Sequence, residues 1–337
     1  MTTRGSGLAI PTGPIKSHLA TRRHVLDIDD FSQEEINEVL QNTDVMKEVL
    51  SRDIRKVPTL RGKTIFTLFY ETSTRTRASF EQAGKIMSAD VINVSASGSS
   101  VQKGESLYDT ALTLQAMNAD MIVIRHAHSG APYFLARHLD ASIINAGDGA
   151  HAHPTQALLD LYTIKSHLGR INGLKVAIVG DILYSRVVRS DLWALTKMGA
   201  QVTVCAPPTL LPPDFLQGFP EEHPFAGVKV ETKVDAAIEG ADVIMALRLQ
   251  LERQEAGHLP SLREYSRMYG INSKRMKLAN PNALVMHPGP MNEGVEIDPD
   301  VAHGAASVIE EQVTNGVAVR MALLYSLVTP SHNGSKS

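Results

Sequence analysis

Short runs rich in apolar and β-branched residues alternate with helical patterns along most of this chain, and that alternation limits the folds open to it. The first set of runs is Lys63–Tyr70, Val91–Ser95, Met121–Arg125 and Ser142–Ala146, and the second is Lys175–Gly180, Gln201–Ala206, Lys229–Thr232, Asp242–Leu247 and Ala283–His287. Helical patterns lie near 75–88, 106–117, 154–168, 186–198 and 261–269. Such alternation is typical of parallel sheets with helices on both faces. The sequence therefore predicts two doubly wound parallel-sheet α/β domains linked by interdomain helices.

The length agrees with two domains, because 337 residues are about twice the roughly 150 residues of a typical domain. Ser32 and Glu35 form a capping-box pattern that predicts a helix through about Leu50. We expect these parts: a disordered leader over 1–23, a first domain over 24–153, an interdomain helix over 154–168, a second domain over 169–309, a C-terminal helix over 310–328 packing back on the first domain, and a disordered tail over 329–337.

Charge and cysteine content argue against several classes of function. The chain has 33 Lys and Arg against 36 Asp and Glu, a net charge of −3, so nothing favours nucleic-acid or anionic-membrane binding. Its one cysteine, Cys205, excludes an intrachain disulfide or a Cys-based metal site within one chain. A single cysteine suits a reducing compartment, and we expect the cytoplasm. No apolar run approaches the roughly 18 residues of a membrane span.

The N-terminal segment leaves two interpretations open. Residues 1–23 contain four basic residues and no acid, as organellar transit peptides do, but lack the apolar core of a secretory signal. Five Gly and Pro residues would interrupt an amphipathic helix there, which favours a disordered leader.

Candidate site residues follow the predicted strands, where open parallel sheets bind ligands. The run from Ser73 through Thr74, Arg75 and Thr76 to Arg77 opens a helix directly after a strand. Free backbone N–H groups, hydroxyls and guanidinium groups there suit a phosphate, although a capped helix with solvated arginines has the same pattern. The chain has no Walker-type loop, and the turn 180–186 lacks Gly-x-Gly-x-x-Gly, so a nucleotide cofactor is not supported.

Two further strand exits carry ionisable groups. Arg125 ends an apolar strand, where a charge needs a partner or a ligand. His153 lies in the glycine-rich stretch 147–156, and its imidazole can donate a hydrogen bond to a carbonyl oxygen. His151 and His153 also suggest a metal, but no convergent cysteine or carboxylate set supports one, and we predict no metal site.

Three later segments complete the candidates. Arg248 and Gln250 lie on one side of an extended chain, and an arginine fork recognises a carboxylate. The segment 287–290 (His-Pro-Gly-Pro) is a stiff loop whose carbonyl groups suit an amide or ammonium group, or it is a simple turn. Lys103, in a glycine-containing loop, is either an anion contact or an ordinary surface lysine.

Together these segments resemble the aspartate/ornithine transcarbamoylase family, and its aspartate-specific members most closely. The resemblance covers residues 24–328. Its motifs are Ser73-Thr74-Arg75-Thr76-Arg77, Lys103-Gly104-Glu105, Arg125-His126, His153-Pro154-Thr155-Gln156, Arg186, Arg248-Leu249-Gln250 and His287-Pro288-Gly289-Pro290. It implies that carbamoyl phosphate and L-aspartate react to N-carbamoyl-L-aspartate and phosphate in pyrimidine biosynthesis, without metal, nucleotide or organic cofactor.

The resemblance also implies roles for these residues. Ser73, Thr74, Arg75 and Thr76 would hold the phosphate, and Arg125, His153 and Thr76 would donate to the carbamoyl oxygen. The carbamoyl amino group would lie against Gln156 and the loop Pro288, Gly289 and Pro290. The aspartate carboxylates would bind Arg186 and Arg248, supported by Gln250 and Lys103. The leaving phosphate would take the amine proton, so no side-chain base is required.

Members of this family are trimers with active sites between subunits. By resemblance, this chain would form a homotrimer in which Ser99 and Lys103 enter the neighbouring site. Whether such trimers bind regulatory chains or dihydroorotase stays open.

Three other functions explain the sequence less well. The ornithine-specific relatives carry a Cys in the His-Cys-Leu-Pro loop, which is absent here, and a cationic side chain would be repelled by Arg248. An inactive scaffold subunit does not explain a complete set of site residues, and a simple anion-binding module does not explain both Arg186 and Arg248. One departure is Glu293, where many bacterial relatives carry a basic residue.

Overall fold

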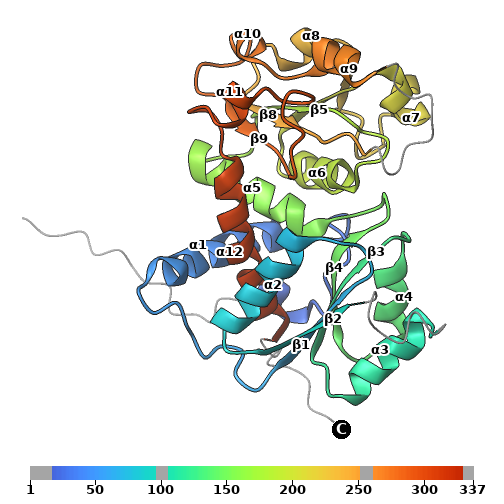
Figure 1. The fold of residues 1–337 in the computed structure, drawn as a ribbon, viewed down its shortest axis with the longest axis vertical. Helices are drawn as coiled ribbons and strands as arrows, with labels where there is room; N and C mark the ends of the chain where they lie inside the picture. Colours follow the sequence, from blue (N-terminus) through green and yellow to red (C-terminus); the bar gives the residue numbers. More distant parts are fainter. Residues whose placement is uncertain (1–16, 96–104, 251–260, 329–337) are drawn as a thin grey trace, which may run out of the picture.

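The computed structural model describes residues 17–95, 105–250 and 261–328. They form two sheets of parallel strands, one in each half of the molecule along its long axis (Figure 1). Ser99 and Lys103, as well as the predicted tail 329–337, lie outside the described residues.

The first sheet, as described, has four strands in the order β2-β1-β3-β4, all parallel. Its strands are β1 (Thr64–Phe69), β2 (Asp90–Ser95), β3 (Met121–His126) and β4 (Ser142–Asp148). Its helices are α1 (Gln33–Ser51), α2 (Thr74–Ile86), α3 (Leu107–Ala116) and α4 (Ala131–His138), followed by α5 (Pro154–Leu168). One face of the sheet packs against α3 and α4 around Phe66, Leu68 and Ile124, and the other contributes to the large core shared with α1, α2 and α5.

The second sheet, within the described residues, has five parallel strands in the order β7-β6-β5-β8-β9. Its strands are β5 (Lys175–Val179), β6 (Gln201–Cys205), β7 (Lys229–Glu231), β8 (Val243–Ala246) and β9 (Leu284–Met286). Its helices are α6 (Arg186–Lys197), α7 (Pro213–Gln217), α8 (Val234–Ile238), α9 (Leu262–Tyr269), α10 (Ser273–Met276) and α11 (Pro299–Ala302), followed by α12 (Ile309–Val328). In Figure 1, α6 lies on the side of this sheet that faces the first sheet, and α8, α9 and α10 lie on the other side.

The predicted fold class and all nine predicted strands are confirmed, with strand ends moved by one or two residues. The eight-residue helix α4 was not predicted. Its N-cap is Gly130 in the left-handed conformation (φ 85°), without a capping side chain, so Pro132 in the first turn is the one start signal that the sequence offers. The short helices α7, α8, α10 and α11 were missed as well, because segments of four or five residues show no helical period.

Residues 17–23, the described part of the predicted disordered leader, are ordered. Residues 18–21 form a 3-10 helix whose Leu19 is buried against α1. Arg22 donates to Glu35 and Asp30, each at 2.9 Å, and its guanidinium lies 3.7 Å above the Phe31 ring. These contacts order a segment that we expected to be disordered, because its basic residues find acids on α1 and the turn before it. Residues 1–16 lie outside the described residues.

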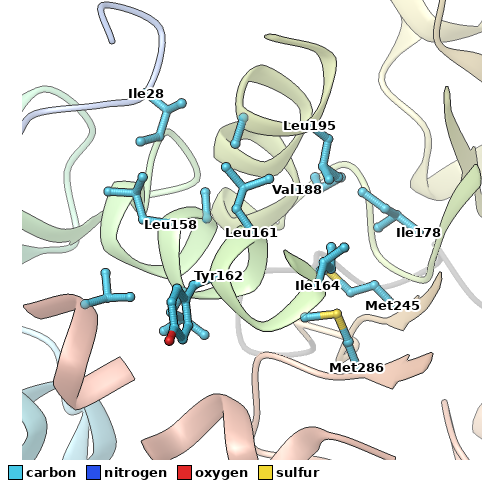
Figure 2. Close-up of a cluster of buried hydrophobic side chains, with 14 of the residues drawn as sticks. Ile28, Leu158, Leu161, Tyr162, Ile164, Ile178, Val188, Leu195, Met245 and Met286 are labelled. Atoms are coloured by element: carbon cyan, nitrogen blue, oxygen red, sulfur yellow. The ribbon is translucent and has the colours of Figure 1, made fainter. Parts of the chain in front are cut away.

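One large hydrophobic core extends across both sheets, in addition to the smaller one between the first sheet and α3 and α4. Figure 2 shows its centre, where Leu158, Leu161 and Ile164 of α5 meet Val188 and Leu195 of α6. Met245 of β8 and Met286 of β9 lie beside Ile164 in the same view. The helix α12 then packs on α1, α2 and α5. Burial on most sides explains why α5 has eleven consecutive buried residues and hardly any polar face.

Each sheet has a point where the chain reverses its direction of winding, between β1 and β3 in the first and between β5 and β8 in the second. Ligands of open α/β sheets bind outside the carboxyl ends of strands at such points. Four arginines end or follow these four strands: Arg75 after β1, Arg125 in β3, Arg186 after β5 and Arg248 after β8. The topology therefore brings together four cations that are widely separated in the sequence.

Candidate active site

A cavity of about 820 Å³ opens between the carboxyl ends of the two sheets. Every predicted site residue in the described part of the chain lines it. These are Ser73, Thr74, Arg75, Thr76, Arg125, His153, Gln156, Arg186, Arg248, Gln250, Pro288, Gly289 and Pro290. We call Ser73–Thr76, Arg125, His153 and Gln156 the first-sheet wall, and Arg186, Arg248, Gln250 and 288–290 the second-sheet wall.

The N-terminus of α2 supplies the anion-binding part of the first-sheet wall. Ser73 is the N-cap residue, yet its hydroxyl makes no capping bond, so the oxygen is left for another partner. Thr76, in the first turn, is buried, whereas Arg75 reaches across the cavity. Free N–H groups of the first turn and the positive end of the helix dipole both favour an anion at this position.

Arg75 lies directly against the second-sheet wall. A Cβ atom built on Gly289 would sit 2.6 Å from the Arg75 Cζ atom, and Gly289 has φ +66°. Glycine is therefore the one residue that fits both the backbone and the guanidinium at this position. Burial, and secondarily the charge of Arg248, lower the pKa of Arg75, which shows that the two guanidinium groups face the same space.

Arg125 is held at the end of β3 by backbone and carboxylate contacts. Its Nη1 donates to the Ala146 carbonyl oxygen at 3.2 Å, and its Nε lies 3.4 Å from Glu71 Oε2. Gly147 lies beneath it with φ +114°, and a Cβ there would come within 3.2 Å of Arg125 Nη1 and 2.9 Å of Arg186 Nε. A side chain at 147 would thus displace both arginines.

His153 is a neutral, buried imidazole at the N-terminus of α5. Its backbone N–H donates to Ser190 Oγ at 2.9 Å, and Ser190 donates to Asp27 Oδ1 at 2.8 Å. Burial lowers the pKa of His153 well below its ordinary value, and nearby Arg125 and Arg186 lower it further. The ring atom Nδ1 is buried and has no hydrogen-bond partner within the described residues, as expected of a group that binds a ligand.

The loop after β9 is fixed by its first residue. His287 Nδ1 accepts from the Gly289 N–H at 2.8 Å, so Nε2 carries the ring proton and lies 3.2 Å from Glu296 Oε1. Glu296 also accepts from the Asn292 N–H at 2.6 Å. These bonds hold Pro288 and Gly289 at the cavity without using their own carbonyl oxygens.

Arg186 and the 248–250 segment form the rest of the second-sheet wall. Arg186 is 5% exposed, and its Nη1 donates to the Gly149 carbonyl oxygen at 3.2 Å. Arg248 and Gln250 are half-buried. The Gln250 N–H donates to Asp181 Oδ2 at 3.1 Å, while Asp181 Oδ1 accepts from the Tyr184 N–H. The buried Asp181 thus joins the segments after β5 and β8.

Among the lining residues that the sequence analysis did not predict, three carry a charge or an amide group: Glu71, Gln312 and Arg320. Glu71 Oε2 lies 2.7 Å from Arg186 Nη2 and links that arginine to Arg125. The position of Glu71 just after β1, beside a predicted anion site, could have indicated that it lies at the site. Gln312 and Arg320 lie on α12, far along the chain, and nothing local indicates that they reach the site.

Other groups that drew attention in the sequence lie away from the cavity. His126 packs on the Tyr70 ring at 4.8 Å, and His151 Nδ1 pairs with Asp148 at 3.1 Å. Glu293 pairs with His303 at 3.1 Å on the surface and does not line the cavity. The described residues contain no group of three or more His, Cys, Asp or Glu side chains placed to hold a metal ion. Among these same residues, no helix has the length and apolar content needed to cross a bilayer.

Comparison with known proteins assigns the family. Residues 23–166 match the model of the aspartate/ornithine carbamoyltransferase carbamoyl-P binding domain, and residues 172–327 match that of the Asp/Orn binding domain. The chain is 63% identical over 306 residues to the aspartate carbamoyltransferase catalytic subunit of Roseiflexus castenholzii, covering 91% of this chain and 95% of the relative.

Solved structures agree in fold. The aspartate transcarbamoylase from Trypanosoma cruzi in complex with carbamoyl phosphate and aspartate is 32% identical with a TM-score of 0.81, covering 90% of this chain and 95% of that one. The ornithine carbamoyltransferase from Pyrococcus furiosus is 28% identical with a TM-score of 0.78, covering 90% and 96%. Both match almost equally well, so the fold by itself does not select the amino acid. On its domain matches and sequence identity, the chain belongs to the aspartate/ornithine carbamoyltransferase family.

Proposed function

We propose that this chain transfers the carbamoyl group of carbamoyl phosphate to the amino group of L-aspartate, giving N-carbamoyl-L-aspartate and phosphate. The observation that carries the proposal is the convergence of Arg75, Arg125, Arg186 and Arg248 with His153 on one cavity. Four cations around a neutral donor suit a phosphate and two carboxylates near a carbonyl group. The relative from Roseiflexus castenholzii carries the corresponding name.

In this proposal the first-sheet wall binds carbamoyl phosphate. The phosphate lies at the N-terminus of α2, where it accepts from Ser73, Thr74, Arg75 and Thr76. The carbamoyl oxygen accepts from Arg125, His153 and Thr76. The unpartnered ring nitrogen of His153 supports this role, because a neutral imidazole donates one hydrogen bond without adding charge.

The reaction is an acyl transfer at the carbamoyl carbon. The lone pair of the aspartate nitrogen attacks that carbon, and the C=O electron pair moves to oxygen, where Arg125 and His153 stabilise the negative charge. The bond from carbon to the bridging phosphate oxygen then breaks. Phosphate leaves with that electron pair and takes the proton from the amine. Arg75 stabilises the charge on the departing phosphate.

The second-sheet wall selects aspartate in this proposal. Its two carboxylates pair with Arg186 and Arg248, with Gln250 in support. Glu71 keeps the Arg186 guanidinium in a fixed orientation through the 2.7 Å contact. Ornithine would place an ammonium group beside Arg248, which is repulsive. Pro288, Gly289 and Pro290 complete the pocket for the carbamoyl amino group.

We further propose a domain division and an assembly. Residues 24–153 form the carbamoyl-phosphate domain and 169–309 the aspartate domain, joined by the helix 154–168 and by 310–328. The chain works as a homotrimer in the cytoplasm, with Ser99 and Lys103 of each subunit completing the site of its neighbour. Mixing two inactive variants, Arg75→Ala and Lys103→Ala, then restores part of the activity through hybrid sites, and a mixture as inactive as its parts contradicts shared sites.

The activity is tested by assaying the purified chain with carbamoyl phosphate and either aspartate or ornithine, and by quantifying the carbamoylated amino acid. Turnover with aspartate alone supports the proposal. Turnover with ornithine overturns the role given to Arg248. Absence of turnover with both, from a chain that binds carbamoyl phosphate, supports the scaffold alternative.

A further inference from the structure

A buried carboxyl group behind the cavity takes no part in the mechanism above. Asp160, on α5, is 2% exposed and lies one helical turn after Gln156. It accepts hydrogen bonds from side chains of two different helices, Gln156 of α5 and Gln312 of α12. We propose that Asp160 is a positioning residue which turns the Gln156 amide oxygen toward the cavity and so makes the site prefer a carbamoyl group to an acetyl group. This inference rests on the proposed function.

A backbone N–H group determines which atoms of this series of hydrogen bonds donate and which accept. The His287 N–H, which can only donate, donates to Gln312 Oε1 at 3.0 Å. The amide of Gln312 is thereby oriented with its oxygen toward the loop and its Nε2 toward Asp160 Oδ1, 2.6 Å away. The oxygen and nitrogen of a glutamine amide have nearly the same shape, but the orientation of the Gln312 amide is determined because the His287 N–H can only donate.

Asp160 in turn determines the orientation of the Gln156 amide. Above a pH of about 7, the value to which burial raises the pKa of Asp160, this side chain is ionised and can only accept, so Gln156 meets it with Nε2, at 3.1 Å from Oδ1 and 3.2 Å from Oδ2. The Gln156 oxygen is then on the side away from Asp160, in a residue that lines the cavity. Gln156 and the 287–290 loop, which both line the cavity, are therefore oriented by one buried series of hydrogen bonds.

The charge on Asp160 has a nearby counterion. Burial raises the pKa of Asp160 to about 7, and the hydrogen bonds from Gln312 and Gln156 and the positive charge of Arg320 of α12, which also lines the cavity, limit that rise. Gly316 leaves the space that the Arg320 side chain occupies, since a Cβ there would lie 2.5 Å from Arg320 Nη1. Asp191 of α6, a second buried carboxyl close enough to Asp160 to interact with it electrostatically, has an oxygen without a hydrogen-bond partner in the described structure.

This arrangement matters for the choice of acyl group. A carbamoyl group carries an NH2 group where an acetyl group carries a methyl group of similar size. An oxygen acceptor at Gln156 binds the NH2 group and gains nothing from the methyl group. With the amide reversed, two NH2 groups would face each other, and the preference would disappear.

The test uses two stable ligands that differ at this one group, phosphonoacetamide and its methyl ketone counterpart acetonylphosphonate. Calorimetric titration of the full chain gives a Kd for each, and their ratio is the amide preference. We expect the wild-type protein to bind the amide more tightly by about 10- to 100-fold. Because binding is measured, the result does not depend on turnover with aspartate.

Asp160→Asn is expected to reverse the Gln156 amide. Its new side-chain oxygen takes the Oδ1 position, where it accepts from Gln312, so its new NH2 group takes the Oδ2 position, 3.2 Å from Gln156 Nε2. Two donors at that distance repel each other, and the Gln156 amide avoids this by turning its own oxygen inward. The amide preference should then fall to about one, through weaker binding of phosphonoacetamide with little change for acetonylphosphonate. Equal weakening of both ligands would indicate a merely structural role and overturn the proposal.

A charge-conserving double variant separates orientation from stability. In Asp160→Asn combined with Gln156→Glu, the new carboxylate accepts from position 160 and presents its second oxygen to the ligand. The amide preference should return to within about threefold of wild type. Gln156→Glu alone places two carboxylates side by side and should weaken both ligands. If the single Asp160 variant does not fold, the double variant decides, and its failure to recover the preference overturns the proposal.

Asp191→Asn is the matched control, because it removes a neighbouring buried carboxyl that makes no bond to Gln156 or Gln312. Its amide preference should equal that of the wild-type protein. Loss of the preference in this control would show that any buried charge in the region has the effect, against a specific role for Asp160. Turnover assays with aspartate run in parallel, and their failure would bear on the proposed function alone.

Discussion

Three residues of the first-sheet wall (Thr76, His153 and Gln156) and the Arg248–Gln250 segment of the second-sheet wall line the same cavity but are supported differently, while Thr74 and Arg75 of the first-sheet wall are exposed. Thr76, His153 and Gln156 are at most 8% exposed, and His153 and Gln156 have buried groups behind them. Arg248 and Gln250 are half-buried, and Asp181 holds the Gln250 backbone through a single hydrogen bond.

This difference agrees with the two tasks proposed for the cavity. Groups that stabilise charge on a reacting carbonyl must be in place before the reaction, because reorganising them would add to the barrier. Groups that bind the carboxylates of an incoming amino acid have to admit it first. Substitutions in the two regions should therefore affect different kinetic constants.

The largest effect is expected for Arg75→Ala in the first-sheet wall. Loss of the guanidinium that stabilises the departing phosphate should lower kcat by a factor of about 100 to 1000 and leave the fold intact. The measurement is steady-state turnover with both substrates saturating, alongside thermal unfolding. Arg77→Ala is the control, since Arg77 belongs to the same run and is also exposed but does not line the cavity. Near-normal turnover of Arg75→Ala would contradict the role.

Arg248→Ala should raise the KM for aspartate by about 10- to 100-fold, because a carboxylate loses a charged hydrogen-bond partner. The KM for carbamoyl phosphate should change little, which separates the two regions. Arg189→Ala, an exposed arginine of α6 outside the cavity lining, serves as control. An unchanged aspartate KM would remove Arg248 from the acceptor site.

Gly289→Ala tests the contact by which the second-sheet wall supports Arg75. The new methyl group would lie 2.6 Å from Arg75 Cζ, so the guanidinium must move, and we expect kcat to fall by about tenfold. Gly294→Ala has the same kind of backbone strain, with φ +80°, but nothing lies within 4 Å of its Cβ position. Equal activity loss in both variants would mean that strain, and not Arg75, is responsible.

The last effect concerns stability, and not a kinetic constant, behind the first-sheet wall. Burial raises the pKa of Asp27 from 3.8 to about 6, so the folded state keeps a proton that the unfolded state has lost between these values. The folded state is therefore destabilised as pH rises through this window, by at most about 3 kcal/mol at about 1.4 kcal/mol per unit. Asp27→Asn should gain stability relative to wild type between pH 4 and about 6.

This difference is measured by chemical unfolding of both proteins at a series of pH values. Asp29→Asn, an exposed carboxyl two residues away, should show no such trend. A constant difference between Asp27→Asn and wild type over this range would mean that Asp27 titrates normally in the folded protein.

Much of the fold was predictable because its signals are local. The strand β3 is one example, since its apolar run Met121–Ile124 is buried and the charge of Arg125 marks where the strand leaves the core. The helix α1 is another, because Ser32 and Glu35 make both bonds of the predicted capping box. The helix α4 and the ordered residues 17–23 were not predicted, because their stability comes from packing against distant parts of the chain.

The sequence by itself indicated the strands and the longer helices other than α4, and it indicated which polar residues follow the strands, since periodicity and strand-exit charges are properties of neighbouring residues. Only the tertiary structure decided how those residues are supported. Glu71 meets Arg186 across 115 residues of chain, and Gln312 meets Asp160 across 152. The physical reason is that a buried charge or amide takes its orientation from whichever donor or acceptor the packing brings to it, and no local pattern specifies that partner.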